Sequence, residues 1–239
     1  MDETAIFLEM DFNITIDFRG NKNIDIHTTD KENYKLTVLL IVCGDRTKLA
    51  PLIILKGEPG KTIEINMRKL SFVKNNNMYI YCQKNSWCDN NLFIEWINEI
   101  FIKYQNSLQD KVLLIIDKDT SHVSSESSDY FKKNNIGFSL IPPGTASLLQ
   151  PLDLSVNKIF KDHIRLLFEQ NRLLYDNINP RIKLNTWRID VLTYINKVWN
   201  DESYIRKETI VNGFKKEGIV GNSYYSLEEE STTDNYLFD

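Results

Sequence analysis

The sequence lacks any apolar run long enough to cross a lipid bilayer. The longest such runs, residues 37–43 and 112–116, are far shorter than the roughly 20 residues that a membrane helix needs. The N-terminus also lacks the charged and then apolar pattern of a secretory leader. We therefore expect a soluble, intracellular protein with no membrane partner.

Cysteine is scarce, with only three residues in the chain: Cys43, Cys82 and Cys88. They cannot all pair with one another, and no C-x-x-C spacing indicates a zinc knuckle. A metal role for Cys82 and Cys88 is less favoured than buried or free thiols. This usage is typical of a reducing compartment.

An excess of basic residues is also missing, because the formal net charge is −4. A free-standing nucleic-acid binder usually carries a basic balance that neutralises phosphates. If DNA is the substrate, its affinity must come from a local basic strip, from metal ions, or from a DNA-binding module outside this sequence.

The composition otherwise resembles that of ordinary globular proteins. Hydrophobic residues make up 42% and charged residues 26% of the 239 residues, which excludes a largely disordered chain. This length suits one large α/β domain with a small appendage.

The first part of the chain has the signals of β-strands. Residues 35–43 and 51–56 are apolar and rich in β-formers, and the short polar stretch between them predicts a hairpin. Residues 5–10 are a further candidate strand, and residues 24–28 a short one within a polar loop. We expect the chain to open with β-structure.

The pattern then changes to helical spacing. Asp89 is placed to cap an amphipathic helix of about four turns. The aliphatic run 112–116 follows and ends at Asp117, as expected of a central strand covered on both faces. Asp117 should therefore lie at the carboxyl end of that strand.

The second half alternates between helices and strands. Ser124 or Ser125 can cap a short helix, residues 137–141 can form a buried strand, and a proline-rich loop leads to Asp153. Asp153 stands at or just before the start of a long helix over residues 154–174. The remaining expectations are a loop over 177–185, helices over 187–199 and 202–216, and a poorly ordered acidic tail over 222–239.

Carboxylates at strand ends and at a helix start can converge at one edge of a mixed sheet. Hard divalent cations prefer oxygen ligands, and two ions about 3.5–4 Å apart can activate water and stabilise the leaving oxygen of a phosphodiester. The plainer alternative is that Asp117 ends a strand, Asp153 caps a helix, and both are solvated.

Several blocks in order resemble the pogo/Tigger transposases, members of the DDE superfamily, over residues 1–219. These blocks are MDET followed by IF (1–7), KLTVLLIVCGDRTKLAPLIILKG (35–57), QKNSWCDNNLFIEW (83–96), LLIIDKDTSH (113–122), IPPGTASLLQPLDLSVNKIFKDHIR (141–165) and FKKEGI (214–219). The segment Gln150-Pro151-Leu152-Asp153 is the most specific of them. The resemblance implies a ribonuclease H-like fold, with a mixed five-stranded sheet and flanking helices. It implies a catalytic core over 1–175 and a C-terminal helical extension over 176–221, followed by the acidic tail.

The resemblance also implies the active site. Asp2, Asp117 and Asp153 would bind Mg²⁺ or Mn²⁺, expected as two ions, and support DNA cleavage at transposon ends followed by strand transfer. DNA would be the partner, with a homodimer as one assembly and the nucleus as the location. His122 would either lie near the metal ions or anchor a loop, while Asp119, outside the family pattern, is expected to face water.

Lys158, Lys161 and Arg165 follow Asp153 at helical spacing and share one face. They would either contact phosphates near the site or form a solvated surface. The four tryptophans, Trp87, Trp96, Trp187 and Trp199, are expected in the core more than as base-stacking platforms.

One departure from the family leaves two functional classes open. The first aspartate of the family lies inside a strand, downstream of a helix-turn-helix region, whereas Asp2 follows directly after Met1. The first class is a nuclease or transposase core. The alternative is a non-catalytic, transposon-derived or domesticated protein that keeps the fold for DNA association or protein interaction.

Overall fold

The computed structural model describes residues 1–7, 35–108, 112–117, 125–175, 184–216 and 218–219. Four strands form one sheet in the order β1 (Asp2–Phe7), β2 (Lys35–Leu40), β3 (Leu52–Lys56) and β4 (Tyr79–Gln83). The first three run antiparallel, and β4 runs parallel to β3. The expected hairpin over 35–56 is confirmed, while β4 was not predicted.

Burial explains the composition of these strands. Nearly every residue of β2 and β3 is buried, because helices cover both faces of the sheet, and such strands read as continuous apolar runs. Strand β1 instead alternates buried and less buried residues. The expected strand over 24–28 lies outside the described residues.

A second, two-stranded sheet contains the parallel strands β5 (Leu113–Asp117) and β6 (Gly137–Ile141). It lies beside the start of β1, because the terminal amine of Met1 donates to the Ile115 carbonyl oxygen at 3.0 Å. The mixed α/β architecture is thus confirmed, but a single five-stranded sheet is not. The described strands form sheets of four and two, since only Met1 reaches the edge of β5.

Strand β5 was expected to be covered on both faces along its whole length, and this expectation is wrong for its first residue. Leu113 is 59% exposed, whereas Leu114 and Ile116 are buried. The carboxyl end of β5 at Asp117 does agree with the sequence expectation.

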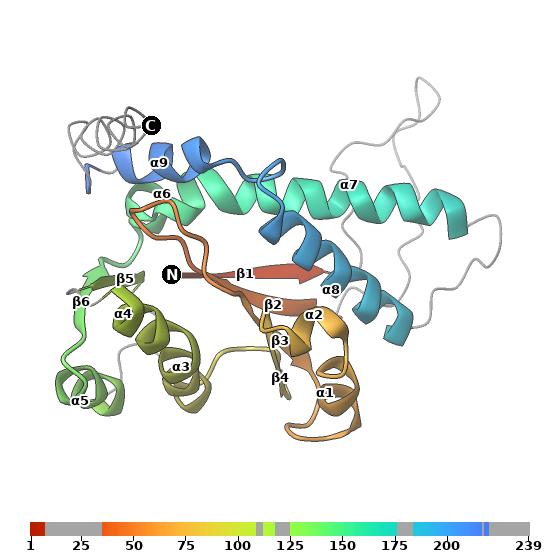
Figure 1. Ribbon diagram of the computed structural model, residues 1–239, viewed down its shortest axis with the longest axis horizontal. Coiled ribbons are helices and arrows are strands. Elements are labelled where there is room, and N and C mark those ends of the chain that lie inside the picture. Colours follow the sequence, from red (N-terminus) through yellow and green to blue (C-terminus); the bar gives the residue numbers. More distant parts are fainter. Residues whose placement is uncertain (8–34, 109–111, 118–124, 176–183, 217, 220–239) are drawn as a thin grey trace, which may run out of the picture.

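One layer of helices packs against Met1, β5 and one face of the four-stranded sheet (Figure 1). Asp89 caps the first of them, accepting from the Leu92 amide at 2.9 Å as predicted. Phe93 and Trp96 are fully buried here and stack on one another. The layer contains α3 (Asn90–Trp96), the π-helical turn η1 (Ile97–Phe101), α4 (Ile102–Leu108) and α5 (Ser125–Lys133).

The other face is covered by the long helix α7 (Asn157–Tyr175), by α8 (Leu184–Asn200), which crosses it, and by two short helices that were not predicted (Figure 1). Trp187 and Trp199 of α8 belong to the same apolar cluster as the sheet residues. The predicted extension over 176–221 therefore shares the core of the preceding domain. The short helices are α1 (Thr62–Met67) and α2 (Ser71–Lys74).

The segment leading into α7 consists of α6 (Ala146–Leu149) and a second π-helical turn, η2 (Leu152–Val156). Helix α9 (Lys207–Lys216) packs on η2. Within the described part of the chain, no helix is both long and apolar enough to span a membrane. Three of the four tryptophans are buried as expected, but the expectation is wrong for Trp87, which is 55% exposed.

Candidate active site

Two of the predicted site residues, Asp2 and Asp153, are brought together by one side chain. The Nδ2 of Asn157 donates to Asp2 Oδ2 in a short hydrogen bond and to Asp153 Oδ1 at 2.9 Å. Asp2 and Asn157 are buried, whereas Asp153 is exposed. A carboxylate from the start of the chain and one from η2 therefore share a single amide donor.

The local sequence explains this geometry. Asp153 and Asn157 are four residues apart and therefore lie on the same side of the helical segment. Asp153 belongs to the π-helical turn η2, and such turns occur frequently at functional sites. Asn157 was not among the predicted site residues, although its spacing from Asp153 could have indicated it.

The electrostatics of the pair are unfavourable in the absence of a cation. The pKa of Asp2 is raised from 3.8 to about 7, first because the side chain is buried and second because Asp153 lies nearby. The hydrogen bond from Asn157 and the N-terminal amine oppose this change, and the charge of Asp117 adds to it. All three predicted aspartates therefore interact electrostatically.

Asp117 contributes charge but does not complete a metal-binding cluster. Among the residues that the structure describes, no group of three or more His, Cys, Asp or Glu side chains is placed to hold one metal ion. Asp117 is half-buried at the end of β5. The segment that follows it, with Asp119 and His122, lies outside the described residues.

The donor chemistry fits a divalent cation. Carboxylate oxygens are the ligands that Mg²⁺ and Mn²⁺ prefer, and the side chain that bridges Asp2 and Asp153 among the described residues is an uncharged amide. A bound cation would offset the repulsion that raises the Asp2 pKa. The residues that could contribute ligands are Asp2, Asp153 and Asp117.

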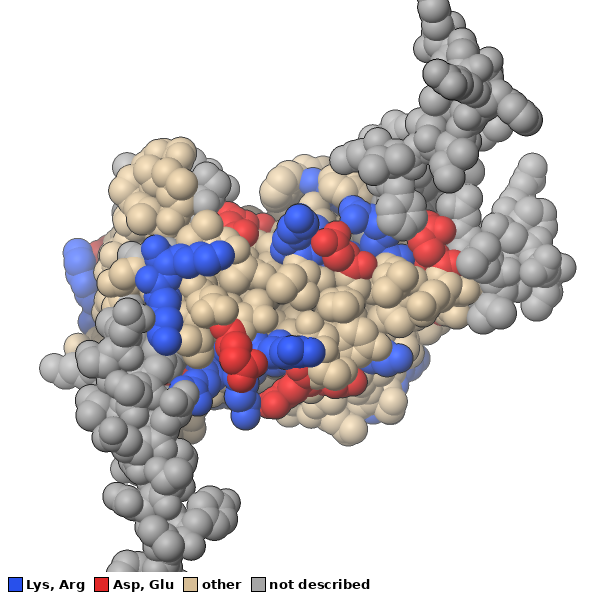
Figure 2. Space-filling model, turned by 90° about the horizontal axis from the view of Figure 1, so that it is seen from above, with Lys and Arg blue, Asp and Glu red and all other residues tan. Residues whose placement is uncertain are grey.

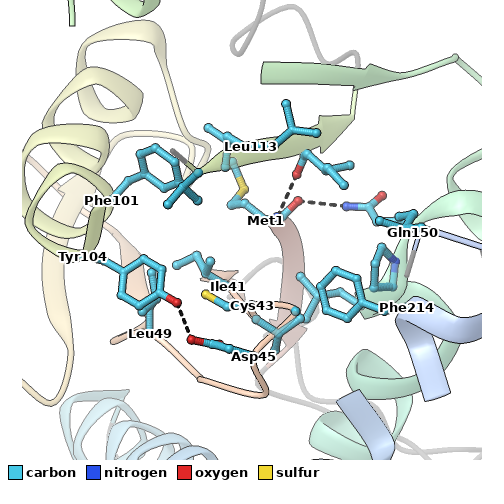
Figure 3. Close-up of a pocket in the computed structure, with 18 of the residues that line it drawn as sticks. Met1, Ile41, Cys43, Asp45, Leu49, Phe101, Tyr104, Leu113, Gln150 and Phe214 are labelled. Atoms are coloured by element: carbon cyan, nitrogen blue, oxygen red, sulfur yellow. Dashed lines mark hydrogen bonds between the residues drawn. The ribbon is translucent and has the colours of Figure 1, made fainter. Parts of the chain in front are cut away.

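Backbone contacts next to the three aspartates connect their segments. Gln150, three residues before Asp153, donates from Nε2 to the Met1 carbonyl oxygen at 3.1 Å (Figure 3). The Met1 amine donates to Ile115, two residues before Asp117. Met1 therefore ties together the segments that carry all three aspartates.

The predicted basic residues lie on the first turns of α7. Lys158 is exposed and Lys161 half-buried. Arg165 pairs with Asp162 at 3.0 Å, which partly neutralises it. In the view of Figure 2, Lys and Arg are interspersed with Asp and Glu, so the described residues on this face form no continuous basic surface.

Comparison with known protein families identifies the chain. The family described as DDE superfamily endonuclease matches residues 33–214. The chain belongs to the DDE superfamily endonucleases. The DDE match includes Asp117 and Asp153 and begins after Asp2.

Two relatives of this DDE protein are the human and mouse proteins named pogo transposable element with KRAB domain. Each is 30% identical over 236 residues, which is 96% of this chain and 36% of the relative. The chain thus spans about a third of their length, and the expected pogo resemblance is confirmed. Among solved structures, the Mos1 transposase paired-end complex with left transposon end gives a TM-score of 0.42 at 12% identity, covering 88% of this chain and 53% of that one.

Proposed function

We propose that this chain is a metal-dependent DDE endonuclease or transposase core that cleaves DNA phosphodiesters and then transfers the strand. The observation that carries the proposal is the shared amide of Asn157, which holds Asp2 and Asp153 together within reach of the charge of Asp117. Structural cores rarely bring buried and exposed carboxylates together without a compensating cation.

Asp2, Asp117 and Asp153 would hold the metal, Mg²⁺ or Mn²⁺, as two ions. When bound, such ions activate water and stabilise the charge that develops on phosphate oxygens. The chain itself positions the carboxylates, because Asn157 orients two of them. Lys158 and Lys161 could contact DNA phosphates on the α7 side, and His122 remains a candidate for a contact near the metal.

The proposed substrate is DNA, in keeping with the family and with relatives named for the pogo transposable element. With a net charge of −4, most of the DNA affinity would come from a local basic strip, from bound metal ions, or from a DNA-binding module outside this sequence. We further propose that the protein forms a homodimer and is located in the nucleus. Sedimentation would test the first proposal, and imaging of the tagged protein would test the second.

A metal titration tests the enzymatic proposal. Adding Mg²⁺ or Mn²⁺ to the EDTA-treated protein should raise its melting temperature, because the cation offsets the repulsion between Asp2 and Asp153. The same ions should support nicking of supercoiled plasmid DNA. The variant Asp117→Asn should lose the nicking while remaining folded.

The matched control is Asp129→Asn, which removes an exposed carboxylate of α5. This variant should nick DNA at the parent rate. If neither ion changes the melting temperature and the parent does not nick DNA, or if Asp117→Asn behaves like the parent, the catalytic proposal is wrong.

A second candidate is a non-catalytic DNA-associated or interaction protein. It is favoured by the lack of a complete three-ligand metal cluster among the described residues. For this candidate, DNA binding measured in EDTA would equal that in Mg²⁺, and no nicking would accompany it.

A further inference from the structure

The exposed tryptophan, Trp87, lies in the turn between β4 and α3. The Lys35 amine lies 3.6 Å from the centroid of its ring. One face of the indole is thus covered by a flexible cationic side chain rather than by the apolar core. A single apolar side chain on a protein surface is ordinary, but the surroundings of Trp87 give this one a specific chemistry.

The turn that presents Trp87 has a strained backbone. Ser86 has a φ of 55°, in the left-handed region that residues other than glycine seldom adopt. The sheet holds Ser86 in place, because its carbonyl oxygen accepts from Thr37 Oγ1 at 2.6 Å and its amide donates to the Gln83 carbonyl oxygen at 3.2 Å. Such strain persists where the surrounding structure fixes it, and it is concentrated at ligand contacts. The anchored turn therefore fixes Trp87 at the surface.

Trp87 contacts a row of side chains at the ends of the strands. Phe7 pairs with Lys35, and the pairing of β2 with β3 brings Lys56 opposite Lys35. The residues next to these two lysines along their strands belong to the apolar cluster under α7 and α8, so the lysines share the other face of the sheet. Phe7 is 45% exposed, and Lys56 is exposed as well. Two aromatic rings and two amines therefore lie together.

The two lysines repel one another. The pKa of Lys35 is lowered from its ordinary value, first by partial burial and second by the charge of Lys56. Among the ion pairs between described residues, none includes either lysine. Asp89, the cap of α3, is engaged elsewhere, because it accepts from the Leu92 amide and from the Gln83 side chain. An anion bound between the two amines would offset their repulsion.

We propose that Trp87, Lys35 and Lys56 form a binding site for single-stranded nucleic acid. An unpaired base stacks on the indole, and the two amines contact the phosphates beside that base. Aromatic rings combined with cations directed at the backbone are a common means of holding single strands. In the bound form the base replaces the Lys35 amine on the ring, and the amine moves to a phosphate.

The combination of a stacking ring with two cations selects a nucleotide over other anions. Free phosphate or an acidic side chain satisfies the lysines but brings no flat ring, and a duplex keeps its bases stacked inside. The inference rests on the proposed nucleic-acid substrate but not on its cleavage. The site lies at the opposite end of β1 from Asp2 (Figure 1), which is about 17 Å away at the rise of a β-strand.

Binding of a labelled oligonucleotide in EDTA tests the proposal, because EDTA removes any contribution from bound metal. The ligand is an oligothymidine of about 15 nucleotides, followed by fluorescence anisotropy. The matched ligand is an abasic strand of equal length, which keeps the phosphates and lacks the bases. The protein is the full chain, as the parent and as the variants Trp87→Ala and Trp87→Phe, the second of which keeps an aromatic face.

Trp87→Ala should weaken oligothymidine binding about tenfold and leave binding of the abasic strand unchanged. Trp87→Phe should recover most of the affinity. The other three tryptophans are buried, so oligothymidine should quench indole emission in the parent and not in Trp87→Phe. The quenching measurement needs no alanine variant, so it decides even where Trp87→Ala is less stable.

The lysines are tested by the double variant Lys35→Gln/Lys56→Gln. It should weaken binding of both strands, because both carry phosphates. The matched control Lys132→Gln/Lys133→Gln removes the same charge from α5 and should weaken binding less. Equal weakening by the two double variants would overturn the assigned role of Lys35 and Lys56.

Equal affinity of the parent and Trp87→Ala for oligothymidine would overturn the proposal, whether or not the protein nicks DNA in Mg²⁺. So would an equal loss on the abasic strand, because no stacking contact would then exist. If Trp87→Ala changes sedimentation of the protein but not oligonucleotide affinity, the surface is a contact between copies of this chain and the proposal is wrong. Absence of metal-dependent nicking with this binding intact would reject the proposed catalysis and support the binding site.

Discussion

Gln150 donates from its side-chain amide to the carbonyl oxygen of Met1 at 3.1 Å, across 149 positions of the sequence. Both residues are buried. Since Met1 adjoins Asp2 and Gln150 begins the segment that carries Asp153, this one bond restrains the separation of two aspartates. The restraint acts through the backbone and does not require metal.

Replacing Gln150 with leucine should therefore loosen the site. The Met1 carbonyl would lose its buried donor, which costs about 1–3 kcal/mol and lowers the melting temperature by roughly 2–10 °C. Differential scanning calorimetry in EDTA measures this change. The control Gln170→Leu alters an exposed residue of α7 and should leave the melting temperature nearly unchanged; an equal decrease in both variants would contradict the role of Gln150.

Asn157→Ala should destabilise the metal-free protein more than the metal-bound one. Without the shared amide, Asp2 and Asp153 keep their repulsion and lose their common donor, at a cost of about 1–3 kcal/mol. A bound cation would take over the compensation. The melting temperatures of parent and variant should differ in EDTA and converge in Mg²⁺. The control Asn200→Ala changes an exposed position of α8, and its melting temperature should show no such convergence with that of the parent.

Asp2→Asn should change how stability depends on pH. The folded-state pKa of Asp2 is raised to about 7 from an ordinary 3.8, so between these values the native protein binds more protons than the unfolded chain. Stability of the parent in EDTA should then fall as pH rises from about 4 through 7. Asp2→Asn removes this contribution, so its stability should exceed that of the parent most clearly above pH 7; parallel profiles measured by urea unfolding would contradict it.

The sequence alone predicted the elements that frame the site. The hairpin of β2 and β3, the Asp89 cap, the end of β5 at Asp117 and the long helix after Asp153 all depend on local composition, periodicity and capping. Such signals involve residues that are close in the sequence, so these elements could be predicted without the structure.

The features that the sequence did not predict depend on contacts between residues that are distant in the sequence. Asn157 can bridge the two aspartates because α7 lies over β1. No local sequence pattern indicates that Asp2 is the second acceptor of the Asn157 amide. The two described sheets meet through the hydrogen bond from the Met1 amine to the Ile115 carbonyl oxygen, a contact between residues 114 positions apart that local periodicity does not predict. Trp87, which is exposed and lies in the loop after β4, carries the Lys35 amine of β2 over its ring, and this contact between distant residues is not visible in the local sequence.

Neutralising Lys158 and Lys161 should weaken DNA binding without changing which sequence is preferred. For every phosphate that the variant no longer neutralises, the slope of log K against log salt should become shallower by about one. Fluorescence anisotropy with Lys158→Gln/Lys161→Gln, over a salt series, measures both effects. The matched control is Lys132→Gln/Lys133→Gln on α5; equal weakening in the two double variants would indicate a general charge effect instead.

Gly213→Ala tests whether the packing of α9 supports the turn that carries Asp153. A Cβ at Gly213 would lie 2.8 Å from the Pro151 carbonyl oxygen and 2.6 Å from Ser155 Oγ. Alanine normally stabilises a helix interior by about 1 kcal/mol relative to glycine, but this clash should reverse the sign and cost about 1–3 kcal/mol.

Adding Ser155→Ala to Gly213→Ala should recover only part of that stability, because the clash with the Pro151 backbone remains. Urea unfolding of the two single variants and the double variant separates these contributions. If Gly213→Ala is as stable as the parent, α9 can move away from η2 at no cost. Metal-dependent nicking by the same variants then reports whether a displaced η2 also moves Asp153 away from Asp2, since a shift of about 1 Å at a catalytic group can reduce the rate roughly a hundredfold.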